Sequence, residues 1–228
     1  MEDTIREYGY KGRVEVVDNG NDFNSDNYDT LTRNASRMEL GLLPEDNVLL
    51  FVGQHIWEKN TAFIINALEI LKDMPYKMFF VGTGYAADEM KEMVARKGLS
   101  GKVTFIGQLT DRNMLRRYFA AADLFLFPSK YDNAPLVVRE SAAMNTPSIL
   151  MAGSTSAGII NDGFNGFLSN DSIYDFAMTI KNLIMHKDII EKVGLNASRT
   201  IARSWSDVID EVGCRYNEIV DRRCVYCV

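Results

Sequence analysis

The sequence has few of the residues from which metal sites and disulfide frameworks are built. Its 228 residues include only two histidines and three cysteines, and no Asp-x-Asp motif occurs anywhere. The cysteines, Cys214, Cys224 and Cys227, all fall within the last fifteen residues. Cys224 and Cys227 have the C-x-x-C spacing of metal and redox sites, but no second pair accompanies them. We therefore expect ordinary reduced thiols and no metal site.

The chain also lacks long apolar runs and an excess of positive charge. No apolar run approaches the roughly 18 residues that span a bilayer, and the charged N-terminus, MEDTIREYGY, lacks a signal-peptide core. The formal net charge of −6 argues against nucleic acid or an anionic membrane surface as the main partner. We therefore expect a cytoplasmic protein that does not bind nucleic acid.

What the sequence does contain is a regular alternation of short apolar runs and segments with helical spacing. Hydrophobic residues make up 46% of the chain, enough for a substantial core. We expect strands at 48–52, 78–81, 103–106, 124–127, 148–150 and 166–168. We expect helices at 58–72, 88–97, 111–120, around Glu140, and at 171–185, 187–202 and 205–221. This alternation predicts a doubly wound, Rossmann-like α/β fold with a parallel sheet.

The first part of the chain does not follow this alternation. An apolar stretch at 14–17 predicts a strand that ends in an Asn19-Gly20 turn. From 22 to 34 the composition is almost wholly polar, which is typical of a linker or a surface loop.

The segment 127–147 holds the clearest candidate site. An apolar strand ends there, a polar loop follows, and Pro135 lies near the first turn of a helix for which Asn133 is the expected cap. Asp132 stands in the loop, and Glu140 lies eight positions later, inside the helix. A helix N-terminus attracts an anion, and carboxylates beside it can accept hydrogen bonds from hydroxyl groups. The pattern therefore suits a nucleotide sugar.

The two carboxylates have two competing interpretations. In the first, Asp132 is an ordinary loop acid, and Glu140 is a surface side chain that pairs with Arg139 or with solvent. In the second, the segment resembles the Glu-x7-Glu motif of the family 4 retaining glycosyltransferases, enzymes of GT-B fold, with Asp132 in place of the first Glu. The neighbouring residues resemble that family as well: Pro128-Ser129, Glu140-Ser141-Ala142-Ala143 and Thr146-Pro147.

The resemblance implies a role for each matching position. Glu140 would accept hydrogen bonds from the ribose hydroxyls, and Asp132 would face the donor sugar. Lys59 and the N-terminus of the helix would hold the diphosphate and stabilise charge on the leaving group. The residues expected at that N-terminus are Asn133, Ala134, Pro135 and Leu136.

The loop after the first expected strand also resembles this family. It contains Gly53, Gln54 and Lys59, where the family has a Gly-Arg…Lys clamp for the diphosphate. Lys59 matches the clamp, but Gln54 replaces the arginine. A glutamine offers a neutral hydrogen bond where an arginine offers a charged planar fork, so this departure puts diphosphate affinity in doubt.

Glycines mark the second loop, where Gly82 and Gly84 fit the pattern G-x-G-x-x-A of a dinucleotide site. A dinucleotide-dependent oxidoreductase is a weak alternative, because the next expected strand is followed by Gly107, Gln108 and Leu109 and not by an acid for a ribose. We expect Gly82 and Gly84 to let the backbone approach a ligand closely. The resemblance implies that the third loop, with Gly107, Gln108 and Leu109, binds the base.

Beyond the fifth expected strand the match is partial. The segment 162–166 resembles the family's Asp-Gly-x-x-Gly turn, whereas Gly158 stands where the family has a Glu. Trp205 and Tyr216 resemble the aromatic C-terminal helix that crosses to the first domain of GT-B enzymes, although core packing would also explain both.

Taken over about residues 10–220, the resemblance implies the C-terminal, donor-binding half of a GT-B glycosyltransferase. We divide the chain into the end of an upstream domain with its linker (1–34), a nucleotide-sugar-binding domain (35–221) and a tail (222–228). The donor would be a nucleoside diphosphate sugar, used without cofactor or metal for retaining transfer to a saccharide or lipid-linked acceptor.

The resemblance also implies a missing partner, the N-terminal domain that binds the acceptor. We therefore expect no sugar transfer by this chain alone, and at most peripheral membrane contact through the missing half. The rival hypothesis is a non-catalytic nucleotide- or partner-binding module of the same fold, which Gln54 and Gly158 favour.

Overall fold

The computed structural model describes residues 2–23 and 30–224. Cys227, the second cysteine of the C-x-x-C pair, lies outside them, and Cys214 is an exposed free thiol. Among the described residues, no helix is both long enough and apolar enough to cross a membrane.

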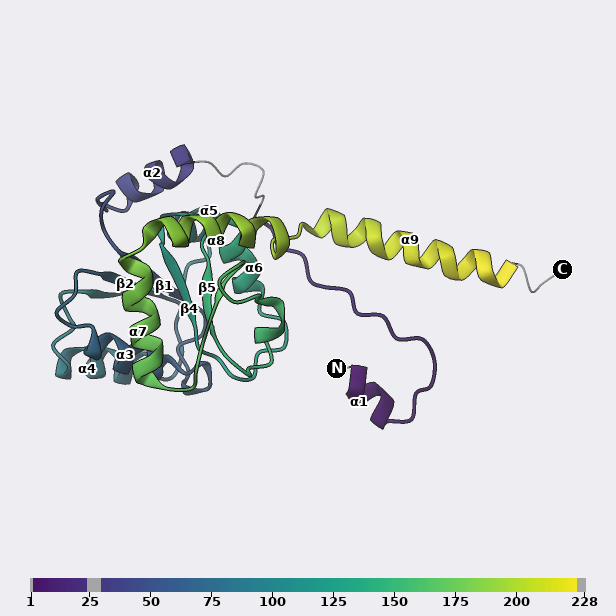
Figure 1. Cartoon of the computed structure of the whole chain (residues 1–228), viewed down its shortest axis with the longest axis horizontal. Coiled ribbons are helices and arrows are strands. Elements are labelled where there is room, and N and C mark those ends of the chain that lie inside the picture. Colours follow the sequence, from purple (N-terminus) through teal and green to yellow (C-terminus); the bar gives the residue numbers. More distant parts are fainter. Residues whose placement is uncertain (1, 24–29, 225–228) are drawn as a thin grey trace.

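A single parallel sheet organises the fold (Figure 1). Its six strands follow the order β3-β2-β1-β4-β5-β6, and every neighbouring pair is parallel. The strands are β1 (Val48–Val52), β2 (Lys77–Val81), β3 (Val103–Gly107), β4 (Leu124–Phe127), β5 (Ser148–Met151) and β6 (Phe167–Ser169). The order reverses between β1 and β4, as in a doubly wound sheet, so the predicted fold class and all six predicted strands are confirmed.

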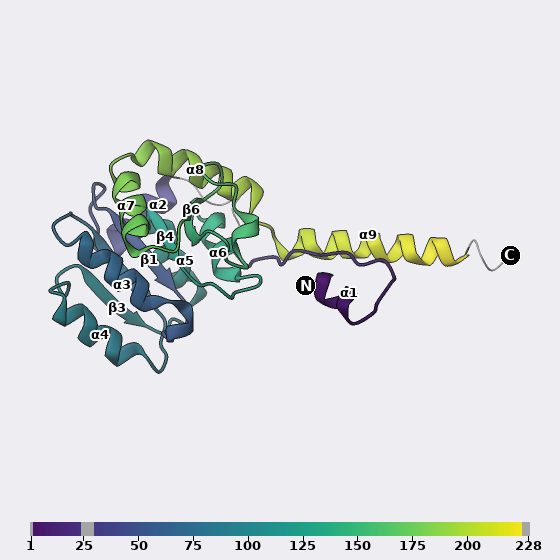
Figure 2. The ribbon, with the colours of Figure 1, turned by 60° about the horizontal axis from the view of Figure 1, so that its bottom comes forward.

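Helices cover both faces of this sheet, which explains why β1, β4 and β5 are buried along their whole length (Figures 1 and 2). The α-helices are α1 (Glu2–Glu7), α2 (Thr30–Glu39), α3 (Thr61–Ile70), α4 (Ala87–Arg96), α5 (Arg112–Ala121), α6 (Leu136–Ala143), α7 (Ile173–Ile184), α8 (Lys187–Thr200) and α9 (Trp205–Cys224); η2 (Trp57–Lys59) and η3 (Ala157–Ile159) are 3₁₀ helices. The helix α3 packs against α4 and α7, while α5 packs against α2 and α6.

The predicted strand at 14–17 is wrong, because these residues are irregular in the structure. No strand of the described chain lies beside them to supply a hydrogen-bonding partner. Instead the segment runs along α9, where Arg215 pairs with the Glu15 carboxylate at 3.0 Å and bonds to the Val16 carbonyl at 3.4 Å. An apolar stretch becomes a strand only when another strand is available, and the sequence alone did not reveal this.

The predicted loop at 22–34 is also wrong from Thr30 onward, where α2 begins. Two arginines of this helix bind Asp123, just before β4: Arg33 at 2.6 Å and Arg37 at 2.9 Å. Arg37 is buried and also donates to three carbonyl oxygens within the α2–β1 connection and to that of Ala121. The predicted domain boundary after residue 34 therefore falls within a helix that packs on the sheet domain.

The predicted helix at 58–72 is divided in two by Asn60. This residue has a left-handed backbone with φ of 58°, which ends η2 and lets α3 begin at Thr61. Asparagine adopts this conformation more readily than most residues. Because of this break, Lys59 ends η2 and lies outside α3. Its side chain reaches the loop that follows β4, where it enters the candidate site.

The helix α9 extends away from the α/β body, and the segment before residue 20 accompanies it (Figures 1 and 2). The start of α9 is held by the body through an isolated bridge between Asn21 and Ser204. Beyond that point several apolar side chains of α9 are exposed, including Ile209, Tyr216 and Ile219.

Candidate functional site

The loops after β1 and β4 meet at the point where the strand order reverses, which is where open α/β sheets bind ligands. Lys59 Nζ lies 2.5 Å from Asp132 Oδ1, so the structure brings together two of the three predicted catalytic residues. The Asn60 side chain donates to the Pro128 carbonyl at 3.2 Å and holds the same two loops together. Lys59 and Asp132 are only 24% and 21% exposed, so their ion pair is sheltered from solvent without being closed to a ligand.

One oxygen of the Asp132 carboxylate is left unpaired by the described part of the chain. Its Oδ2 atom is buried and has no hydrogen-bond partner in the part of the chain that the structure describes. The loop around it is fixed by Thr155, whose hydroxyl donates to the Asp132 carbonyl at 2.9 Å. An unpaired buried acceptor is costly for the folded protein, so Oδ2 is suited to a hydroxyl donor from outside the chain.

The helix α6 begins at Leu136 with its first N–H groups uncapped by any side chain. Pro135 occupies the N-cap position, so the predicted cap by Asn133 is wrong: the helix begins too late for the Asn133 side chain to reach its first N–H groups. Asn133, Ala134 and Leu136 are exposed, and Pro135 is half-buried. The positive end of the helix is therefore open toward the loop that carries Asp132.

Glu140 is not the surface side chain of the first interpretation. Its side chain is only 8% exposed, and its Oε1 accepts a hydrogen bond from Arg112 Nη2 at 2.6 Å. Arg139 does not pair with it, because that guanidinium donates to the Ile201 carbonyl and pairs with Asp18. A buried carboxylate that pairs with Arg112 beside the candidate site is consistent with the second interpretation.

The loops after β1, β2 and β3 surround a cavity of about 280 Å³. Five of the predicted binding residues line it: Gly53, Gln54, Gly82, Gln108 and Leu109. Leu115 of α5 lines it too, one helical turn after Arg112, so the cavity lies along the same helix that reaches Glu140. Gln54 and Gln108 are exposed, which leaves both side-chain amides accessible to a ligand.

Gly82 and Gly84 are required by the packing of one loop on another. A Cβ atom at Gly82 would lie 1.9 Å from the Gly53 carbonyl oxygen, and one at Gly84 would lie 2.4 Å from that of His55. We expected these glycines to make room for a ligand, but the chain that approaches them is the protein's own first loop. Gly107 continues this packing, since its carbonyl accepts the N–H of Gly82 at 2.8 Å.

Comparison with known proteins identifies the family. A model of glycosyl transferases group 1 matches residues 32–199, which is most of the chain. The chain belongs to the group 1 glycosyl transferases. The sequence is 28% identical over 207 residues to a D-inositol 3-phosphate glycosyltransferase of Nocardia farcinica, covering 86% of this chain and 45% of that protein. It is 27% identical over 182 residues to an uncharacterized glycosyltransferase of Methanocaldococcus jannaschii, covering 77% of this chain and 46% of the other.

This group 1 glycosyl transferase thus spans about half the length of the curated relatives it matches. Solved structures share its fold at low sequence identity. Sucrose-phosphate synthase from Thermosynechococcus elongatus superposes with a TM-score of 0.83 and 21% identity, over 97% of this chain and 56% of that one. The C-terminal domain of LpcC, a glycosyl transferase group 1 family protein from Francisella tularensis, superposes with a TM-score of 0.68 and 21% sequence identity, over 78% of this chain and 95% of that one. HepE from Anabaena, solved with UDP-glucose, superposes with a TM-score of 0.78 and 20% sequence identity, over 94% of this chain and 60% of that one.

Two residues at the site were missed by the sequence reasoning. His55 is 1% exposed, lies edge-on to Phe80 and Phe105, and its Nε2 has no partner among the described residues. Burial lowers the pKa of His55, with a smaller contribution from Lys91, so the imidazole is neutral at pH 7. Arg112 was missed as well, because nothing in the sequence relates it to Glu140. The one available signal was Asp111, a good helix cap, which places Arg112 at the first turn of α5.

Proposed function

We propose that the chain is the donor-binding half of a retaining, metal-independent glycosyltransferase and that it binds a nucleoside diphosphate sugar. The observation that carries this proposal is the arrangement around the start of α6. Lys59 comes from η2, Asp132 from the loop before α6 and Glu140 from α6 itself, and no side chain caps the N-terminus of that helix. A cation, free N–H groups and two carboxylates together match a diphosphate that carries hydroxyl-bearing groups on either side.

The phosphates would bind to Lys59 and the first turn of α6. A lysine ammonium has three N–H groups, so Lys59 can keep its bond to Asp132 and still donate to phosphate oxygens. The helix contributes N–H groups and the positive end of its dipole. Both would stabilise the charge that develops on the leaving diphosphate, which is the task that a divalent cation performs in other sites.

The hydroxyl groups of the donor would bind to the carboxylates. Glu140 would accept hydrogen bonds from the ribose, and Oδ2 of Asp132 would accept one from the sugar. The base would occupy the neutral cavity lined by Gln54, Gln108 and Leu109, where uncharged side chains and backbone groups are available. The diphosphate and the hydroxyl groups would thus contact charged groups of the protein, and the base would contact neutral ones.

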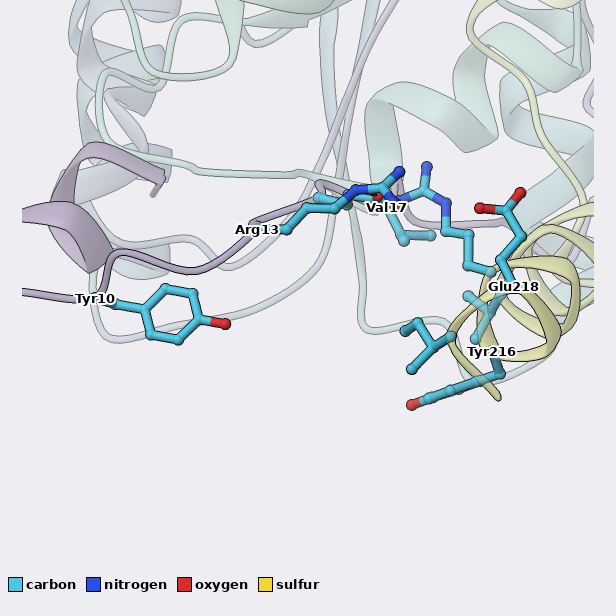
Figure 3. A pocket seen from close by; sticks show the side chains of 9 residues that line it. Tyr10, Arg13, Val17, Tyr216 and Glu218 are labelled. Atoms are coloured by element: carbon cyan, nitrogen blue, oxygen red, sulfur yellow. Dashed lines mark ion pairs between the residues drawn. The ribbon is translucent and has the colours of Figure 1, made fainter. Parts of the chain in front are cut away.

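The acceptor side would come from the half of the relatives that this chain does not cover. We expect such a half to dock beside residues 10–17 and α9, which line a cavity of about 440 Å³ outside the sheet domain (Figure 3). Its lining includes the exposed side chains of Tyr10 and Tyr216. Arg215 of α9 joins the two segments beside it through an ion pair with Glu15, and it also pairs with Glu211 on its own helix. The acceptor held by such a half would be a saccharide or a lipid-linked saccharide.

Calorimetry with the purified chain tests the proposal directly. The ligands are the diphosphate sugars of uridine, guanosine and adenosine, each titrated with and without a chelator of divalent cations. We expect at least one to bind, with the same affinity in both conditions. A chelator-sensitive affinity would contradict metal independence. Absence of binding across the panel at millimolar concentration would favour the non-catalytic module, for which Gln54 in place of an arginine is the specific argument.

A further inference from the structure

Arg112 contacts both the expected ribose site and the segment that enters the domain from residue 20. It is the first residue of α5, and its Nη2 donates to Glu140 Oε1 at 2.6 Å and to Asp22 Oδ2 at 3.3 Å. Its guanidinium carbon lies 4.6 Å from the centre of the Phe23 ring, which is a cation–π distance. The guanidinium group of Arg112 therefore contacts the buried carboxylate of Glu140, the exposed carboxylate of Asp22 and the ring face of Phe23.

The segment that holds Arg112 is itself firmly attached. Phe23 is 5% exposed and lies edge-on to Phe119 of α5, with ring centres 5.9 Å apart. Asn21 donates to the Arg203 carbonyl at 2.8 Å and accepts the N–H of Phe23 at 2.8 Å. A Cβ atom at Gly20 would lie 2.7 Å from the Trp205 backbone nitrogen, so the entering segment and the start of α9 are packed backbone to backbone.

We propose that Arg112 is a positioning residue that holds Glu140 in the orientation needed to accept ribose hydroxyls. This inference rests on the proposed function. Burying a carboxylate is costly unless a cation or several donors pair with it, and Arg112 is the cation that the described structure places beside Glu140. The hydrogen bond goes to Oε1, which leaves Oε2 to accept from the ligand. Phe23 and Asp22 orient the guanidinium in turn, so the residues entering the domain take part in setting the ribose site.

The opposite hypothesis is that Arg112 competes with the ribose for the Glu140 carboxylate. The two hypotheses predict different effects of removing Arg112. If Arg112 blocks Glu140, its removal frees the carboxylate and tightens nucleotide binding. If Arg112 positions Glu140, its removal weakens binding, and the loss is confined to ligands that have ribose hydroxyls. A ligand without those hydroxyls does not use Glu140, so it reports on the rest of the site and on folding.

The experiment measures the preference for a ribonucleoside diphosphate over its 2′,3′-dideoxy counterpart, with the base that binds best among uridine, guanosine and adenosine. The proteins are the full chain, Arg112→Ala, Arg112→Lys and the matched control Arg117→Ala. Arg117 lies on the same helix, is 40% exposed against 45% for Arg112, and pairs with Glu39 away from the site. Thermal melting of each protein shows whether it is folded.

We expect the unaltered chain and Arg117→Ala to prefer the ribonucleotide by about tenfold or more, the ratio for one charge-assisted hydrogen bond. In Arg112→Ala this preference should nearly vanish while affinity for the dideoxy ligand stays the same, and Arg112→Lys should recover part of it. An unchanged preference, tighter ribonucleotide binding, or an equal loss for both ligands would overturn the positioning role alone. Absence of binding by the unaltered chain would overturn the proposed function, and the role of Arg112 with it.

Discussion

The two halves of the edge of the sheet at which we propose that the donor binds are built differently. After β1, β2 and β3, the loops present glycines and glutamines, and they pack on one another through their backbones. Around β4 and α6, the site consists of ion pairs, Lys59 with Asp132 and Arg112 with Glu140. The neutral half is shaped by close backbone packing, whereas the charged half is held together by side chains from distant parts of the chain.

Because of this difference, we expect substitutions in the two halves to affect different properties of the protein. In the neutral half, adding a side chain at Gly82 or Gly84 should act first on folding, because these two positions have no space for another atom. In the charged half an isosteric substitution should leave the fold intact and change ligand affinity.

Gly82→Ala should destabilise the protein most. The added Cβ would lie 1.9 Å from the Gly53 carbonyl, and φ at Gly82 is 134°, which side chains rarely adopt. Overpacking and backbone strain together should lower the free energy of unfolding by about 3 kcal/mol. Denaturant unfolding measures this, with Gly101→Ala as control, since nothing lies near a Cβ at Gly101. Equal stability of the two variants would show that the loop packing is not as close as described.

Glu140→Gln should act on binding and not on folding. The replacement keeps the shape of the side chain but removes the charge that would accept hydrogen bonds from the ribose. Nucleotide and nucleotide sugar should both bind more weakly, by roughly 1–3 kcal/mol. Calorimetry measures this, and Glu39→Gln, which removes a surface ion pair with Arg117, is the control. Unaltered affinity would show that Glu140 lies outside the ligand site.

His55→Phe should flatten the dependence of stability on pH below about pH 6.5. Burial lowers the pKa of His55 from 6.5, so below that pH the unfolded chain takes up a proton that the folded chain does not. Stability is therefore lost as the pH falls, by up to about 1.4 kcal/mol for each pH unit. Unfolding measured between pH 5 and pH 7.5 tests this. The exposed His186 provides the matched control His186→Gln. A dependence unchanged in His55→Phe would mean that other groups cause it.

Gln54→Arg should have the smallest effect, and a favourable one. A charged fork at the edge of the neutral cavity should tighten diphosphate binding by roughly 1 kcal/mol at low salt, and less as salt is added. Gln54→Lys supplies the same charge without the fork, so it should gain less. Affinity that does not respond to either change would place the diphosphate away from Gln54.

The sequence predicted the parts of this molecule that depend on local pattern. The buried run at 48–52 and its five counterparts define the sheet, and the spacing of Asp132 and Glu140 identified a candidate site. Lys59 was also named, and the structure brings it to Asp132.

What the sequence did not predict depends on contacts between distant residues. Arg112 reaches Glu140 only because α5 and α6 are neighbours in the fold. The helix α2 looked like a polar loop because its arginines bind Asp123, which lies far along the chain. The apolar pattern at 14–17 suggested a strand, but a local pattern cannot show whether a partner strand lies beside it.

The most direct test of the account maps the ligand onto the chain. Amide spectra of the isotopically labelled protein would be recorded during titration with the nucleotide sugar that binds best. We predict that the largest shifts occur at Gly53 and Gln108 in the neutral half and at Leu136 in the charged half, with none at Tyr216 on α9. Shifts confined to α9 and residues 10–17, or to one half of the edge, would contradict a single donor site formed by both halves.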